Sequence, residues 1–103
     1  MKKQKIARVA VTNEERDLVF AIAEGLPQLI HIIGQIRIIS MDAHQVGYMD
    51  ILRYLVREKL TGLNFWGWFR EKHDGSILRA IAFVRMKVHS DFAVRKIYAI
   101  KPI

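Results

Sequence analysis

The chain has 103 residues, 51% of them hydrophobic, which is enough apolar material to build one domain over residues 1–103 and argues against disorder of the whole chain. It contains no cysteine, so disulfides, thiolate nucleophiles and cysteine-ligated metal sites are excluded. The formal net charge is +7, and residues 1–12 and 76–103 together hold ten of the 17 lysines and arginines but one acid. This asymmetry favours a polyanionic partner.

Two helical segments are expected in the first part of the chain. Thr12 and Glu15 have the spacing of a capping box, which predicts a helix that ends at Gly25. Pro27 is typical of the first turn of another helical segment. Residues 36–40 contain three isoleucines and fit either a buried strand or a continuation of that segment, so both alternatives stay open here.

A third helix is expected between Asp42 and Thr61. Asp42 and Gln45 have the side chains and spacing of an N-terminal cap, and Gly62 follows the expected end. The apolar residues of this segment follow helical spacing and indicate a face packed in the core: Val46, Met49, Leu52, Leu55, Val56 and Leu60.

The second half of the chain carries a strong hairpin signal. Asp74-Gly75 separates two runs rich in aromatic and apolar residues, 63–70 and 76–88, and this dipeptide is typical of a two-residue β-turn. A further strand is expected from Phe92 onward, after a turn at residues 89–91. The sequence therefore predicts an α+β fold, with two principal helices packed on one face of an antiparallel β-meander of three or more strands.

The hairpin register divides the side chains between two faces of the predicted sheet. Leu63, Phe65 and Phe69 fall on an apolar face that suits the core. The opposite face combines aromatic residues with arginine and lysine, and its members are the candidate binding residues: Trp66, Trp68, Arg70, Arg79, Phe83, Arg85, Lys87, Arg95 and Lys101. An apolar surface of this size is expected to be covered by something.

Three occupants fit that face. RNA or DNA could stack bases on the aromatic rings while the basic side chains neutralise phosphates, and this is the leading prediction because it explains both residue types. An acidic protein or a second copy of the chain, forming a homodimer, is the main alternative. The chain could also cover its own sheet with its N-terminal segment or with residues 26–40.

Catalysis is less favoured than binding, and no cofactor is expected. The four histidines lack the spacing of metal ligands, and no glycine-rich phosphate loop is present. In outline, however, the layout of residues Asp42 to Pro102 resembles the bacterial toxin family of ribosome-dependent mRNA interferases. The resemblance implies a metal-independent ribonuclease and gives a set of residues to test: Arg79, Arg85, Arg95, Lys96 and Tyr98.

Two further expectations concern DNA and membranes. A winged-helix DNA binder would use the helix after Asp42 for recognition and residues 63–88 as its wing. No apolar run approaches the roughly 20 residues that a bilayer span needs, so a cytoplasmic protein without a membrane partner is expected.

Overall fold

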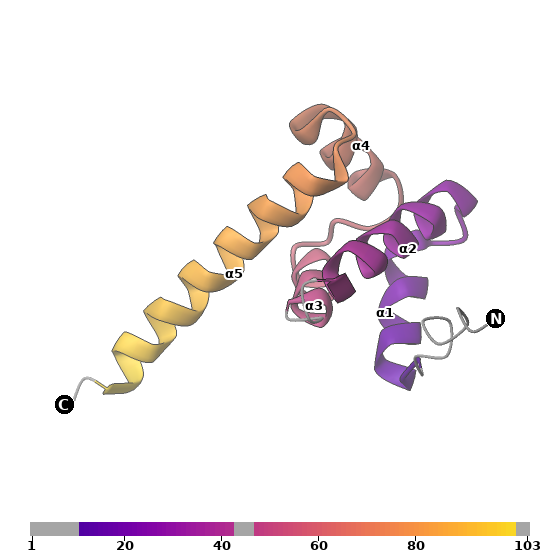
Figure 1. The fold of residues 1–103 in the computed structure, drawn as a ribbon. Coiled ribbons are helices and arrows are strands. Elements are labelled where there is room, and N and C mark those ends of the chain that lie inside the picture. Colours follow the sequence, from indigo (N-terminus) through magenta and orange to yellow (C-terminus); the bar gives the residue numbers. More distant parts are fainter. Residues whose placement is uncertain (1–10, 43–46, 101–103) are drawn as a thin grey trace.

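The chain folds into helices. A computed structural model describes the backbone of residues 11–42 and 47–100, and the side chains of all of these except residues 41–42 and 91–100. Five helices follow one another and no strand occurs in the described stretches: α1 (Asn13–Ala23), α2 (Pro27–Asp42), α3 (Tyr48–Arg57), α4 (Gly62–His73) and α5 (Ile77–Ile100). Helices α1 to α4 form a body with the first half of α5, and the second half of α5 projects from it (Figure 1).

The predicted α+β fold with its antiparallel meander is therefore wrong. Asp74 and Gly75 do form a turn, and both have positive φ, 54° and 72°. The turn joins two helices, because Asp74 ends α4 in the left-handed conformation and its N–H bonds to the carbonyl of Phe69. Residues in the left-handed conformation are common both at the ends of helices and in hairpin turns. The Asp74-Gly75 dipeptide therefore does not distinguish a hairpin from a pair of helices.

The first two helices begin where the sequence predicts. The hydroxyl of Thr12 accepts a hydrogen bond from the N–H of Glu15 (3.1 Å) and caps α1 as predicted. Pro27 begins α2, also as predicted. Residues 36–40 are helical and continue α2, so the alternative of a buried strand is wrong. The carboxylate of Glu15 does not return to the cap and instead lies buried between α1, α2 and α3.

Helix α3 begins later than predicted. Asp42 is the last residue of α2 and does not cap α3, whereas Gly47, with φ of 96°, occupies the cap position. Gln45 lies outside the described residues. Helix α3 also ends earlier than the predicted end at Thr61, because the chain turns at residues 58–61 before α4 starts at Gly62.

The core lies between all five helices. Its fully buried side chains include Ile22 of α1, Ile33 of α2, Leu52 and Leu55 of α3, and Phe65 of α4. Helix α3 packs on α1, α2 and the first half of α5, and so occupies the middle of the body. No helix in the described part of the chain combines the length and the apolar character needed to cross a membrane.

Candidate functional site

Most of the candidate binding residues lie on α4 and on the first half of α5. Trp66, Trp68 and Arg70 belong to α4, and four others lie in the first half of α5: Arg79, Phe83, Arg85 and Lys87. Arg95 lies in the second half of α5, where only the backbone is described, and Lys101 lies outside the described residues. These residues are therefore carried by a pair of helices and not by one face of a sheet, which corrects the predicted geometry.

The two tryptophans point to different sides of α4. Residues two apart in a helix differ by about 200° in direction, whereas in a strand they share a face. Trp66 packs beside Phe69, and the guanidinium of Arg70 lies over its indole ring, 5.3 Å from the centroid. Trp68 instead contacts Phe83 of α5, at 6.1 Å between ring centroids. The single platform expected from the sequence is divided in two.

Both tryptophans are half-buried against the core, and so is Phe83. Each ring is therefore only partly open to solvent. A cation–π contact of this kind contributes about 0.5–1 kcal/mol at an exposed site. The pairing also holds the guanidinium of Arg70 over the indole ring of Trp66, an arrangement that suits a phosphate next to a base.

His73 lies behind Trp68 at the end of α4. Its ring meets that of Trp68 edge-on at 4.4 Å and that of Phe83 at 5.3 Å. Its Nε2 is buried and has no hydrogen-bond partner among the residues that the structure describes. Burial lowers the pKa of His73 below its usual value, and the positive charges of Arg79 and Lys72 lower it further. The neutral imidazole acts here as a packing group between α4 and α5.

The basic residues of α5 have different environments. The guanidinium of Arg79 pairs with Asp74 at 2.9 Å, and both side chains are mainly exposed. The ammonium of Lys87 lies over the ring of Phe83, 5.5 Å from its centroid. Arg85 is half-buried and lies against Gly47 at the start of α3, where an added Cβ would be 3.4 Å from its Nε.

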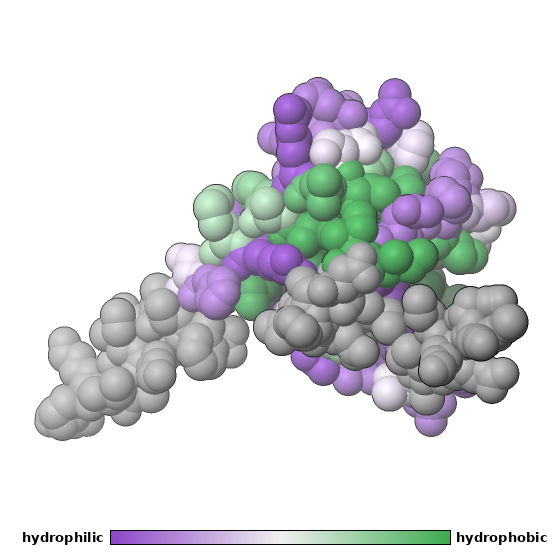
Figure 2. All heavy atoms as spheres, viewed as in Figure 1, coloured by the Kyte–Doolittle hydropathy of each residue, from purple (hydrophilic) through white to green (hydrophobic). Residues whose placement is uncertain are grey.

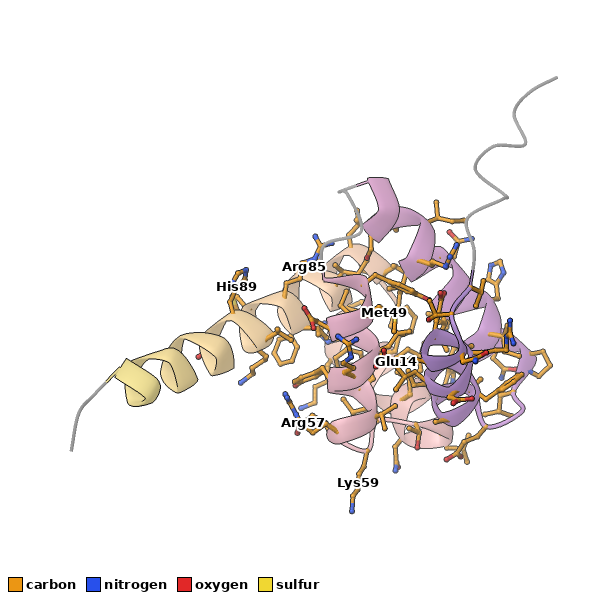
Figure 3. The ribbon with its side chains drawn as sticks, turned by 90° about the horizontal axis from the view of Figure 1, so that it is seen from below. Glu14, Met49, Arg57, Lys59, Arg85 and His89 are labelled. Atoms are coloured by element: carbon orange, nitrogen blue, oxygen red, sulfur yellow. The ribbon has the colours of Figure 1, made fainter. Side chains whose placement is uncertain are left out.

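The sequence interpretation missed Arg57 as a member of this surface. Its guanidinium lies over the ring of Tyr54 at 5.4 Å, which adds a third cation–aromatic pair. In Figure 3, Arg57 and Arg85 lie at opposite ends of α3, both on the side from which α5 leaves the body. The alternation of tyrosine and arginine in α3 was visible in the sequence, but only the packing of α3 beside α5 brings it to the site.

Charge is divided between the two halves of the fold. Residues 13–57, which span α1 to α3, contain four basic residues (lysine or arginine) and six acids. Residues 62–100, which span α4 and α5, contain seven basic residues and three acids. Most of the acids near the start of α1 are already paired: Arg53 bonds to Glu14 and Asp50, and Arg37 bonds to Glu15. Helices α4 and α5 therefore carry the positive pole of the molecule. We call Arg57, Arg70, Arg79, Arg85 and Lys87 the basic root of α5.

The buried polar network around Glu15 is structural. Oε2 of Glu15 accepts hydrogen bonds from Nε of Arg37 (2.6 Å) and from the hydroxyl of Tyr48 (2.9 Å), which ties α1 to α2 and α3. Burial and the bond to Glu15 raise the pKa of Tyr48 far above its usual value, so its proton is held firmly. Such a network suits helix positioning better than proton transfer.

The described side chains form no group of three or more acids and histidines that could hold a metal ion. Comparison of the chain with protein-family models, with curated proteins and with solved structures finds no match. The toxin-like layout and the winged-helix alternative both required strands after residue 62, and both lose that support because residues 62–73 and 77–100 are helical. The chemistry that remains is attraction of anions to a basic, partly aromatic surface.

Proposed function

We propose that this chain is a small non-catalytic module that binds RNA or DNA through the basic root of α5. The observation that carries the proposal is the charge division: α4 and α5 are basic, whereas α1 to α3 are slightly acidic. Polyphosphates release counterions when they meet such a surface, and this supplies affinity without sequence recognition.

Three members of the basic root, Arg70, Arg79 and Lys87, are exposed, and their contacts leave them accessible to phosphates. Arg79 and Asp74 pair on the surface with side-chain exposures of 68% and 77%, and exposed pairs of this kind are worth about 0–1 kcal/mol. A phosphate group can therefore replace the carboxylate. Arg70 and Lys87 rest on aromatic rings, so their cations are partly ordered before a ligand arrives.

The test compares two charge-matched double variants. Arg79→Gln with Lys87→Gln removes two positive charges from the basic root, and Arg16→Gln with Arg53→Gln removes two from α1 and α3. Fluorescence anisotropy with a labelled mixed-sequence RNA, and with a DNA duplex, measures affinity over a series of salt concentrations. Each lost phosphate contact reduces the slope of log affinity against log salt by about 1.

We expect the first double variant to bind more weakly and with a shallower salt slope, and the second to behave like the unmodified chain. Equal losses in both variants would mean that net charge alone attracts the nucleic acid. An unmodified chain that does not bind either probe at low salt would overturn the proposal.

Protein association is the second candidate, and one observation favours it. Leu78 and Met86 of α5 each expose 66% of their surface, and Ile38 of α2 exposes 57%. Figure 2 shows apolar residues gathered over the middle of one face of the body. None of these exposed apolar residues belongs to the basic root, so the two functions can coexist.

A further inference from the structure

Helix α5 has a second apolar side that the body does not use. Ile81, Val84 and Val88 pack toward the body, whereas Leu78, Ala82 and Met86 follow one another every four residues on the side turned away from it. Leu78 and Met86 are 66% exposed and Ala82 is exposed as well. A helix with apolar residues on two opposite sides usually packs against two partners.

This outer row continues along the projecting half of α5. Continuing the same helical spacing along the backbone, positions 89, 93, 97 and 100 lie on the line of Leu78, Ala82 and Met86, and three of them are Ala93, Ile97 and Ile100. The intervals repeat as four, four and three residues, which is close to the period of an α-helix, so the row stays on one side of the helix for its whole length. The 24 residues of α5 extend over about 36 Å.

The order of large and small residues in the row favours a second copy of α5 as the partner of this row. The row is centred on residues 89 and 90, close to the midpoint of α5. When a second α5 lies antiparallel about this centre, Met86 meets position 93 of the second copy, an alanine, and Ala82 meets position 97, an isoleucine. Each of these two central layers then joins a large residue to a small one. In a parallel pair, alanine would face alanine and leave gaps, which lowers the packing density.

We propose that the outer row of α5 is a homodimer interface in which two α5 helices pair antiparallel over their full length. The projecting half of each helix then covers Leu78, Ala82 and Met86 of the other. Figure 1 shows that this half of α5 has no neighbour among the other helices, and Figure 3 places His89, at the centre of the row, where α5 has left the body. The antiparallel arrangement also pairs opposite ends of the helix dipoles.

Charge gives the dimer a salt dependence opposite to that of nucleic-acid binding. Arg85 and, by helical register, Lys96 lie beside the row, so two paired helices bring like charges together. Salt screens this repulsion. We therefore expect the dimer to become more stable as salt rises, whereas binding to polyphosphate weakens. A failure of one proposal is thus distinguishable from a failure of the other.

The first experiment measures molecular mass by light scattering over a range of protein and salt concentrations. The unmodified chain is expected to dimerise, Met86→Glu to remain monomeric, and Leu63→Glu to dimerise like the unmodified chain, because Leu63 is 75% exposed on α4 and outside the row. Circular dichroism checks that both variants keep their helices. A chain that stays monomeric at all concentrations, or a dimer that survives Met86→Glu, would overturn the proposal.

The direction of pairing is tested by disulfide formation, which is unambiguous here because the chain has no cysteine of its own. A mixture of chains carrying Ala82→Cys and Ile97→Cys should form mixed dimers on oxidation. Ala82→Cys alone should not cross-link, since its two copies would lie about 22 Å apart and a disulfide joins Cα atoms about 4.4–6.8 Å apart. Efficient cross-linking of Ala82→Cys to itself would show a parallel pair and contradict the proposed arrangement.

Discussion

Single residues at the connections hold these helices in place, and Gly62 is the clearest example. It begins α4 with φ of 56°, a left-handed conformation that L side chains adopt with difficulty, and an added Cβ would collide with the carboxylate of Glu24. That carboxylate accepts a hydrogen bond from the hydroxyl of Thr61 at 3.0 Å, beside the start of α4. The end of α1 is thereby tied to the start of α4.

We expect Gly62→Ala to lower the free energy of unfolding by at least about 1 kcal/mol, because the left-handed conformation alone costs this much for alanine. Gly34→Ala is the matched control. Gly34 lies within α2, its added Cβ meets nothing within 4 Å, and alanine there should stabilise the chain by about 0.5–1 kcal/mol. Urea denaturation measures both, and a Gly62→Ala variant as stable as the parent would contradict the role given to this turn.

Tyr48 has a pH signature of its own. We expect Tyr48→Phe to lower the free energy of unfolding by about 1.5–3 kcal/mol near neutral pH, because it removes a hydrogen bond to the carboxylate of Glu15. Because the folded pKa of Tyr48 is raised, its stabilising effect is complete below the unfolded pKa of about 10 and declines as pH rises above it. The difference in unfolding free energy between parent and variant should therefore narrow above about pH 10. A difference that is constant with pH would refute this.

At the level of the helices, the sequence predicts the first part of the fold better than the second. Thr12 and Pro27 are local signals with one structural meaning each, and both helix starts are where they were expected. Residues 63–88 misled the interpretation because tryptophan and phenylalanine favour strands, and because Asp74-Gly75 suits both hairpin and helix end. The helical spacing of Phe65, Phe69 and His73 was a competing signal, and core packing made it decisive.

The candidate site shows the same division. Its aromatic and basic residues can be listed from the sequence, and most of them lie on α4 and the first half of α5. The contacts between these residues could not be predicted from the sequence. Trp66 and Trp68 point to different sides of α4, which follows only once the segment is known to be helical. Arg57 lies near α5 only because α3 packs beside it.

His73 connects α4 to α5 and should make this junction sensitive to acid. Its folded pKa is lowered, so the stabilising effect of the neutral ring is complete above the unfolded pKa of about 6.5 and is lost as pH falls below it. His73→Phe keeps an aromatic ring beside Trp68 and Phe83 but cannot be protonated. Thermal unfolding should show that the variant loses less stability than the parent between neutral and mildly acidic pH. Equal losses would mean that another group is responsible.

At the scale of the whole molecule, α5 joins two surfaces of different chemistry. Its first half carries much of the basic root, and its outer side carries the apolar row that continues into the projecting half. An antiparallel pair would place two basic roots at opposite ends of a shared rod of two helices. Each dimer would then present two contacts to one polyphosphate chain, and linked sites bind more tightly than separate ones.

The central claim, that nucleic acid binds to the basic root of α5, is tested most directly by NMR. Amide signals of the ¹⁵N-labelled chain are followed during titration with a mixed-sequence single-stranded RNA at low salt. The account predicts shifts that are largest at Arg70 in α4 and over residues 77–88, that fade as salt is raised, and that are small in α1. Shifts concentrated in α1 and α2, or no shifts at all, would contradict it.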